Sequence, residues 1–185
     1  FTTSAVPRQT HEVGANAHPD GVYDVGEQFG TIGFVITSED DASVTVEVTT
    51  YRSETYPTPD RRPAVSHGVS LVEDLARRDF TINAMALDPL QGELIDPFGG
   101  IADLGRREIS AVGDPHERFN EDPLRILRAA RFAAQLDFEI VPATLGAMRE
   151  LGPQLERISK ERVAAELNKL LVADAVERGL TVLHQ

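Results

Sequence analysis

Residues 73–86 have the sequence EDLARRDFTINAMA, and they determine how the rest of the chain is interpreted. Two arginines, Arg77 and Arg78, stand directly before Asp79, so cations suited to phosphates lie beside an acceptor suited to a ribose hydroxyl. Asn83 follows four residues later, and a helix would place it on the same face one turn further on. The Arg-Arg-Asp tripeptide by itself more often begins a salt-bridged helix, so the nucleotide interpretation depends on the whole string.

Residues 121–132 form a second charged stretch, EDPLRILRAARF. On one helix, Asp122 and the glutamate before it stand three and four residues ahead of Arg125, so the three side chains can converge. Arg128 and Arg131 follow at three-residue steps and suit phosphate or backbone contacts. A capped helix with ordinary surface ion pairs is the alternative for this stretch taken alone.

Two segments ahead of these stretches predict a β-hairpin. Residues 31–37 and 43–51 are rich in alternating β-branched residues, and residues 38–42 between them form an acidic turn. In the second strand Glu47 falls on the more polar face, opposite the valines. A glutamate in such a position is usually solvated, so the strand pattern alone does not indicate a site.

The remaining pattern predicts an α+β fold in two parts. Further short strands are expected at residues 22–25, 84–87 and 93–95, with a turn at 88–92. From Asp114 the apolar spacing becomes helical, and helices are expected at residues 122–136, 143–151, 160–172 and 174–183. We therefore expect one domain with a mixed β-sheet, residues 1–113, and an all-α domain, residues 114–185.

Composition limits the classes of function. The 185 residues contain no cysteine, which excludes thiol chemistry and disulfides and favours a reducing cytoplasm. No apolar run approaches the roughly 20 residues that a membrane span needs.

The net charge of -12 argues against a nucleic-acid partner, but the distribution of the charges along the chain weakens that objection. Residues 1–60 hold ten acids and two bases, whereas the rest of the chain holds twenty acids and sixteen bases, among them pairs such as Arg61-Arg62 and Arg106-Arg107.

The two charged stretches, together with EVTTYR at residues 47–52, resemble motifs of class II tRNA nucleotidyltransferases and bacterial poly(A) polymerases. Members of this family have a polymerase-β-like nucleotidyltransferase head with a mixed sheet, followed by a helical neck that binds RNA and nucleotide. The resemblance implies that residues 1–113 are a head domain shortened at its N-terminus and residues 114–185 the neck domain.

The resemblance also implies roles for single residues. Asp79 would contact the ribose 2′-OH, and Asp122 and Arg125 would hydrogen-bond the edge of an incoming C or A, where a template base would otherwise stand. Glu47 would be a catalytic carboxylate close to the metal ions. The other implied nucleotide contacts are Arg52, Arg78, Asn83, Arg128 and Arg131.

Three further stretches match the family and have a structural interpretation. They are GEQFGT at residues 26–31, DPFGGIADL at residues 96–104 and SKERVAAEL at residues 159–167. The Gly99-Gly100 pair predicts a turn that only glycine allows. Ser159, with Arg162 and Glu166, predicts a capped and ion-paired helix start.

The family holds two Mg²⁺ ions with an Asp-x-Asp pair after a Gly-Gly-x-x-x-Arg-Asp loop, and neither pattern occurs in these residues. Because residues 1–7, FTTSAVP, resemble the segment that continues from that pair in the family, we expect the chain to begin just after the pair and to be cut off at both ends.

The implied parent enzyme adds CCA to tRNA 3′ ends from CTP and ATP, while this fragment would be inactive and hold no metal. A bacterial poly(A) polymerase and a non-catalytic nucleotide- or RNA-binding module remain as alternatives, and the oligomeric state stays open.

Overall fold

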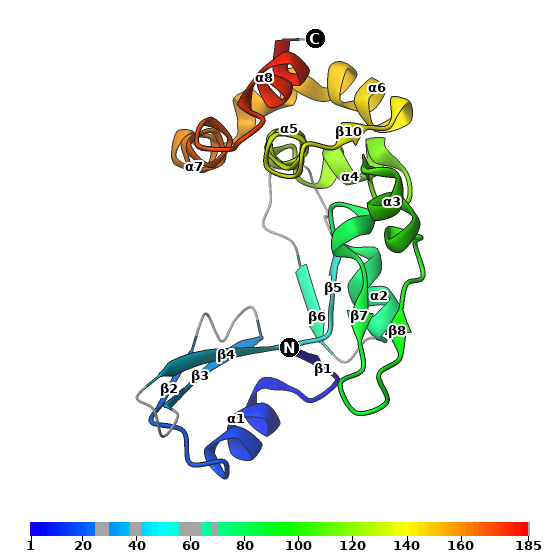
Figure 1. Cartoon of the computed structure of the whole chain (residues 1–185). Coiled ribbons are helices and arrows are strands. Elements are labelled where there is room, and N and C mark those ends of the chain that lie inside the picture. Colours follow the sequence, from blue (N-terminus) through cyan, green and yellow to red (C-terminus); the bar gives the residue numbers. More distant parts are fainter. Residues whose placement is uncertain (25–29, 38–41, 56–63, 68–69, 185) are drawn as a thin grey trace. The chain divides into compact units, whose positions relative to one another are not determined.

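The computed structural model describes residues 1–24, 30–37, 42–55, 64–67 and 70–184, and the chain forms two compact units, Phe1–Leu75 and Ala76–Gln185 (Figure 1). Most of GEQFGT, most of the expected turn at residues 38–42, and the Arg61-Arg62 pair lie outside the described residues. The two units meet in the sequence between Leu75 and Ala76. The division into head and neck domains after residue 113 stays a prediction.

The first unit is built on a four-stranded sheet with the order β1-β4-β3-β2. The expected hairpin is confirmed, because β3 (Thr31–Thr37) pairs antiparallel with β4 (Ser43–Thr50), with Gly33 opposite Glu47. Strand β2 (Gly21–Asp24) pairs antiparallel with β3, and β1 (Thr2–Thr3) pairs parallel with β4. The alternation of β4 therefore places Glu47 on the exposed side and the valines on the other.

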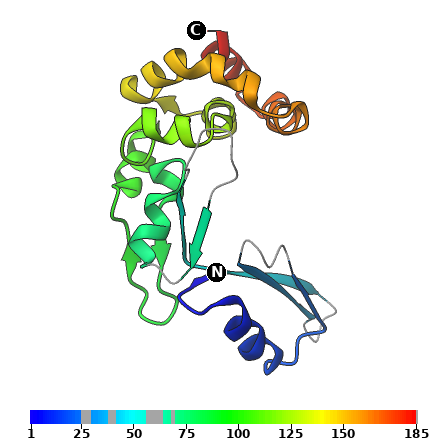
Figure 2. The same cartoon turned by 180° about the vertical axis from the view of Figure 1, so that it is seen from behind.

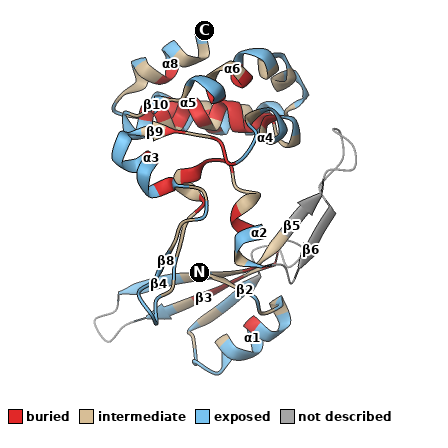
Figure 3. Ribbon diagram, turned by 90° about the vertical axis from the view of Figure 1, so that its right-hand side faces the viewer, coloured by how far each residue is buried: buried red, intermediate tan, exposed pale blue. Residues whose placement is uncertain are grey.

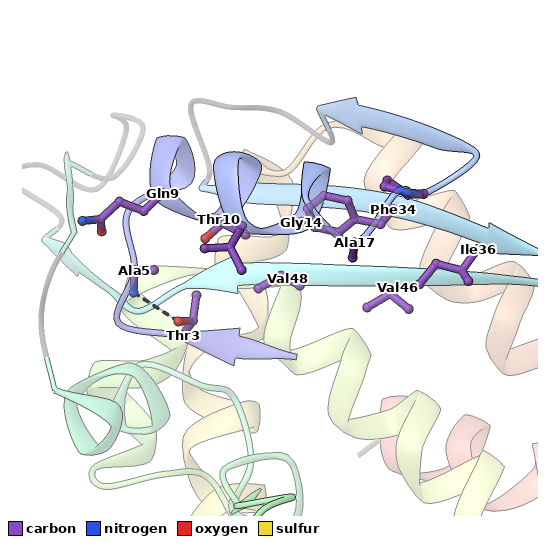
Figure 4. A pocket seen from close by; sticks show the side chains of 12 residues that line it. Thr3, Ala5, Gln9, Thr10, Gly14, Ala17, Phe34, Ile36, Val46 and Val48 are labelled. Atoms are coloured by element: carbon purple, nitrogen blue, oxygen red, sulfur yellow. Dashed lines mark hydrogen bonds between the residues drawn. The ribbon is translucent and has the colours of Figure 1, made fainter.

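Helix α1 (Pro7–Ala15) covers the apolar side of this sheet. The side chains of Phe34, Val46 and Val48 line a cavity of about 360 Å³ beneath it (Figure 4). Gly14 allows the close approach, because a Cβ at this position would lie 2.1 Å from the ring of Phe34.

A second hairpin and a short helix complete the first unit. Strand β5 (Arg52–Thr55) pairs antiparallel with β6 (Ala64–His67), and α2 (Leu71–Ala76) follows. The buried carboxylate of Asp74 accepts the backbone N–H of Arg52 at 3.1 Å, so α2 is tied to β5.

The second unit begins at Ala76, the last residue of α2. A short 3-10 helix, η2 (Thr81–Asn83), leads into the antiparallel strands β7 (Ala86–Leu87) and β8 (Leu94–Ile95). The expected turn between these strands is confirmed, since the carboxylate of Asp88 accepts the N–H groups of Leu90 and Gln91. Both strands are shorter than expected.

Helix α3 (Gly100–Arg106) begins at the predicted glycine pair. Gly99 has a φ of 77°, in the left-handed region that favours glycine. At Gly100 a Cβ would lie 2.3 Å from the carbonyl oxygen of Thr81, so this position needs glycine for space.

Helices make up most of the remaining chain. They are α4 (Pro115–Glu121), α5 (Leu124–Leu136), α6 (Pro142–Leu151), the 3-10 helix η3 (Gly152–Arg157), α7 (Lys160–Leu171) and α8 (Val176–His184). The four expected helices are present with ends shifted by one or two residues, and α4 is an additional helix. Strand β10 (Glu139–Ile140) is a short strand within this helical part and pairs parallel with β9 (Glu108–Ile109). No helix among the described residues has the length and apolar character that crossing a membrane requires.

The core of the second unit follows α5, which is buried along most of its length (Figure 3). Helices α7 and α8 lie alongside it (Figures 1 and 2). Alanines on α5 permit close packing, and a Cβ on Gly179 of α8 would lie 2.8 Å from the carbonyl oxygen of Ala130. The polar side chains that α5 presents are therefore held on a rigid element.

Candidate nucleotide-recognition site

Asp79 lies in the turn between α2 and η2, and only 8% of it is exposed. Its Oδ2 accepts from Nε of Arg128 at 2.8 Å and lies 2.6 Å from Nη2 of the same residue. Its Oδ1 accepts from Nδ2 of Asn83 at 3.1 Å. The sequence placed Asp79 and Asn83 one helical turn apart. They do converge, but through a turn and a 3-10 helix rather than an α-helix.

Arg125 is equally buried and has three acceptors. Its Nη1 donates to Oε2 of Glu121 at 2.7 Å and to the carbonyl of Arg118 at 3.0 Å, and its Nη2 donates to the carbonyl of Arg77 at 2.9 Å. Arg118 in turn donates to Glu121 and to the carbonyl of Ala76. Arg125 and Arg118 thus fasten α5 and α4 to the backbone just before Asp79.

Asp122 does not lie inside a helix, which corrects the expectation of one helix from residue 122. It ends α4 with an extended backbone, φ -144° and ψ 98°, and α5 starts at Leu124. Its Oδ1 accepts the N–H of Leu124 at 3.1 Å, and its Oδ2 accepts from Nη2 of Arg162 on α7 at 2.8 Å. The side chains of Asp122 and Arg125 therefore have separate partners, although the N–H of Arg125 donates to the carbonyl of Asp122.

Arg128 and Arg131 face carboxylates of the protein. Besides its contact with Asp79, Arg128 has Nη1 at 3.8 Å from Oε1 of Glu166 on α7. Arg131 donates through Nε to Oε2 of Glu166 at 2.6 Å and stacks over Phe132, with Cζ 4.0 Å from the ring centroid. Their expected phosphate contacts stay predictions.

The predicted sugar and base residues meet along α5. Arg128 contacts Asp79. Arg125 contacts the carbonyl of Arg77, which stands two residues before Asp79 in the sequence. Since Arg125 and Arg128 are three residues apart on one helix, they lie on neighbouring positions of its surface. Arg78 lies in the same segment and donates from Nη1 to the carbonyl of Asn83 at 3.2 Å.

Glu47 and Arg52 belong to the first unit. The side chain of Glu47 is exposed on β4, and its carbonyl accepts from the amino group of Phe1 at 2.6 Å. Arg52 is partly buried at the start of β5, and its N–H donates to Asp74. The implied roles of both residues stay predictions.

Three charged residues of this region were not predicted from the sequence as nucleotide contacts: Arg118, Arg162 and Glu166. Ser159 was expected to cap α7 with Arg162 and Glu166 as its ion pair, but its side chain makes no capping bond. Arg162 and Glu166 contact α4 and α5 residues instead. Their spacing of four residues on one helix face was the available signal.

Two observations concern the carboxylates of the described residues as possible ligands of a metal ion. At the start of α2, the backbone N–H and the hydroxyl of Ser70 donate to Glu73 and hold the pKa of that carboxyl below its usual value. Within the described ranges, no three His, Asp or Glu side chains come together in a way that could hold a metal ion.

Comparison with known families gives two matches along the chain. The family model described as "Poly A polymerase head domain" matches residues 1–110. A second model, "Probable RNA and SrmB- binding site of polymerase A", matches residues 137–185.

Similar proteins include the CCA-adding enzyme of Levilactobacillus brevis, 47% identical over 180 residues, which are 93% of this chain and 44% of the relative. The CCA-adding enzyme of Streptococcus suis is 46% identical over 184 residues, covering 99% of this chain and 43% of its own. The chain thus spans less than half the length of the curated relatives that it matches.

Solved structures agree with these relatives. The Bacillus stearothermophilus CCA-adding enzyme in complex with CTP superposes with a TM-score of 0.83 at 39% identity, covering 98% of this chain and 41% of that one. A tRNA nucleotidyltransferase complexed with a primer tRNA and an incoming ATP analog gives a TM-score of 0.76 at 31% identity, covering 99% of this chain and 50% of that one. The expected α+β fold and the resemblance seen in the motifs are confirmed. Because the head-domain model matches more than half of its residues, the chain belongs to the poly A polymerase head domain family.

Proposed function

We propose that this chain provides the nucleotide-recognition part of a template-independent RNA nucleotidyltransferase that adds CCA to tRNA 3′ ends. The main support is that Asp79 and the pair Asp122 and Arg125 belong to one compact unit and are connected through α5. A single nucleoside triphosphate would then be held by its sugar at Asp79 and by its base at the turn between α4 and α5. CTP and ATP are the proposed nucleotides, and tRNA is the proposed acceptor.

Asp79 suits recognition of a ribose 2′-OH. A carboxylate only accepts hydrogen bonds and offers about four lone-pair directions. Asp79 faces Nε and Nη2 of Arg128, Nδ2 of Asn83 and the N–H of Phe80, so a ribose hydroxyl would take the place of one of these donors. The guanidinium of Arg128 also compensates the charge of this buried carboxylate. A deoxyribose offers no donor here and would bind more weakly.

Asp122 and Arg125 suit recognition of C or A. Both bases carry an exocyclic amino group that can donate to Asp122, whereas U carries a carbonyl oxygen at the corresponding place. Arg125 has five N–H donors, three of which make the protein contacts described above. We assign its remaining donors to a ring acceptor of the base.

The other predicted residues have supporting roles in this proposal. Arg52, Arg78, Asn83, Arg128 and Arg131 would orient the triphosphate or the residues that contact it. Glu47 would lie near the reacting phosphate. In the whole enzyme Mg²⁺ would stabilise the attacking 3′-OH and the leaving pyrophosphate, and we expect the enzyme to act in the cytoplasm.

Nucleotide binding by the chain tests this proposal directly. Affinities for CTP, ATP, UTP and dCTP are measured by calorimetry with the wild type and with Asp79→Asn and Asp122→Asn. We expect CTP and ATP to bind more tightly than UTP and dCTP. Asp122→Asn should reduce the preference for CTP over UTP, and Asp79→Asn the preference for CTP over dCTP. Equal affinity of the wild type for all four nucleotides would contradict the proposal.

A bacterial poly(A) polymerase is the second candidate, because the matching model carries the poly A polymerase description. The two candidates differ in their substrates. A CCA-adding enzyme uses CTP and then ATP, whereas a poly(A) polymerase uses ATP alone, so tight CTP binding favours the first candidate and binding of ATP without CTP the second.

A further inference from the structure

The cavity beneath α1 has an apolar body. Phe34 of β3 with Val46 and Val48 of β4 forms one side of it, and α1 with the turn that follows forms the other (Figure 4). Its volume of about 360 Å³ is in the range of sites that bind small organic molecules. None of the described residues that line it is charged. The cavity therefore offers a ligand apolar and uncharged surroundings.

Two apolar side chains of the cavity are also in contact with water. Val13 of α1 is 72% exposed, and Ile36 of β3 is 45% exposed. The cavity is therefore open to solvent at these residues. An apolar molecule that enters would cover both side chains, and the removal of apolar surface from water is favourable.

Thr10 brings an unpaired hydroxyl to the same cavity. The residue lines the cavity from α1 and is 8% exposed. Its Oγ1 is buried and has no hydrogen-bond partner among the described residues. A buried hydroxyl without a partner is costly. Because a threonine in a helix has two accessible χ1 rotamers, this hydroxyl can turn toward a polar group that enters the cavity.

Two further polar side chains line the cavity on the side of Thr10. The hydroxyl of Thr3 accepts a backbone N–H at 3.1 Å and keeps its own proton for another acceptor. The side-chain oxygen of Gln9 accepts a backbone N–H at 3.2 Å, and its NH2 group points to no acceptor within the described part of the chain. Figure 4 shows these polar residues toward one end of the cavity and Ile36 and Val46 toward the other.

We propose that this cavity binds a small neutral amphiphile, an aliphatic chain that ends in one hydroxyl or carbonyl group. An apolar cavity of about 150 Å³ is enough for benzene, so this one can hold roughly six to ten carbons. The chain would lie against Phe34 and Val46, with its polar group at Thr10. The site lies in the first unit and does not depend on the proposed nucleotide recognition.

A charged head group does not fit this cavity. A charge taken out of water needs a partner, and the described lining residues supply no opposite charge. A carboxylate is also repelled by its surroundings, since residues 1–60 hold ten acids and two bases. A neutral alcohol should therefore bind more tightly than the acid of the same length.

Titration of the whole chain with 1-hexanol and with hexanoate tests the site, followed by NMR of the valine and isoleucine methyl groups. We expect 1-hexanol to shift the methyl signals of Ile36, Val46 and Val48, and hexanoate to bind about tenfold more weakly because its charge has to be desolvated. Equal affinity for the two probes would overturn the neutral class of ligand. Shifts confined to other methyl groups would overturn the site.

Thr10→Val keeps the shape of the side chain and removes its hydroxyl. We expect the Kd for 1-hexanol to rise about fivefold, the usual effect of one hydrogen bond, while the Kd for benzene stays as in the wild type. Thr45→Val is the matched control, because Thr45 is exposed on the other side of β4 and does not line the cavity. An unchanged Kd for 1-hexanol in Thr10→Val would contradict the role of its hydroxyl.

Ala17→Leu fills the cavity from the turn after α1. Both 1-hexanol and benzene should then bind about tenfold more weakly, because the space for the apolar part is lost. Ala165→Leu, at an exposed position of α7, should leave both Kd values unchanged, and circular dichroism establishes that each variant is folded. Equal losses in the two variants would show that the probes bind elsewhere.

Sedimentation velocity tests the other occupant of this apolar side, a second copy of the chain. We expect the chain to sediment as a monomer at the concentration used for NMR, with and without 1-hexanol. A dimer that 1-hexanol or Ala17→Leu dissociates would mean that the cavity is a contact between copies, and it would overturn the amphiphile site.

Discussion

Two glycines of α3 differ in the space around them. A Cβ on Gly100 would lie 2.3 Å from the carbonyl oxygen of Thr81, whereas a Cβ on Gly105 has nothing within 4 Å. The close approach at Gly100 brings α3 against η2, where Thr81 also donates from Oγ1 to Asp103 at 2.5 Å. This contact supports the segment that contains Asp79 and Asn83.

We therefore expect Gly100→Ala to lower the free energy of unfolding by about 2 kcal/mol, because the backbone of η2 has to move. Gly105→Ala is the control and should raise stability by about 0.5 kcal/mol, since alanine loses less conformational entropy in a helix. Urea unfolding measures both. Equal effects of the two substitutions would contradict the close approach at Gly100.

At the scale of single residues, the sequence predicted contacts between near neighbours and missed those between distant segments. The contact between Asp79 and Asn83 was expected from their spacing of four residues. The partner of Asp122 is Arg162, forty residues further along, and only the packing of α7 brings them together. Local spacing contains no information on such a pair.

Among the helices, α4 and α7 differ in how their starts are capped. Asp114 precedes α4 and accepts the N–H groups of His116 at 2.7 Å and Glu117 at 3.3 Å. Ser159 precedes α7 and makes no side-chain capping bond. Asp114→Ala should therefore lower the free energy of unfolding by about 1 kcal/mol, the usual value of an N-cap.

Ser159→Ala serves as the comparison for that prediction. Because no capping bond is lost, we expect a change of only about 0.3 kcal/mol. Thermal unfolding followed by circular dichroism detects the difference. A larger loss in Ser159→Ala than in Asp114→Ala would show that the two caps are wrongly assigned.

Helix α2 starts with a reciprocal cap between Ser70 and Glu73. The N–H and hydroxyl of Ser70 donate to Glu73, and the N–H of Glu73 donates to the hydroxyl of Ser70. The pKa of Glu73 is lowered, first by the backbone N–H and then by the hydroxyl. A carboxyl with a lowered folded-state pKa stabilises the fold above its unfolded pKa, and this contribution is lost as the pH falls through the folded value.

Ser70→Ala removes the hydroxyl and keeps the backbone donor. The pKa of Glu73 should therefore rise part of the way toward its usual value, and the loss of the cap on acidification should start at a higher pH. NMR titration of the Glu73 carboxyl measures the shift, with Ser159→Ala as a variant that should leave it unchanged. An unaltered titration in Ser70→Ala would assign the lowering to another group.

Most elements were predicted because their patterns are local. The β3–β4 hairpin followed from alternating β-branched residues, and α5 to α8 followed from helical spacing. Helix α4 was missed although Asp114 and Pro115 form a start signal and Pro123 marks the break that follows Asp122. Strand β10 was missed because two residues paired with β9 give no sequence pattern.

For the molecule as a whole, the sequence predicted the α+β class and the motifs, while the arrangement around α5 needed the structure. Nucleotidyl transfer depends on paired carboxylates that hold two divalent ions. The chain contains no Asp-x-Asp, and its described residues contain no group of three His, Asp or Glu placed for a metal. Nucleotide recognition and nucleotidyl transfer therefore require different side chains from these 185 residues.

We expect the chain by itself to bind CTP but not to extend a tRNA that lacks CCA in the presence of CTP, ATP and Mg²⁺. Primer extension on a sequencing gel, with an intact CCA-adding enzyme as the positive control, measures the transfer. Extension by the chain alone would refute the view that the Asp pair is both needed and missing from these residues.

The contact of Gly179 with the carbonyl of Ala130 limits how this part of the protein can vary. Any side chain at position 179 would push α8 off α5, whereas residues on the opposite side of α8 face solvent and meet no such limit. In a library randomised over α8, survivors should therefore keep glycine at 179 and diversify on the outer face. New surface properties can then be engineered on this helix without disturbing the residues that α5 holds in place.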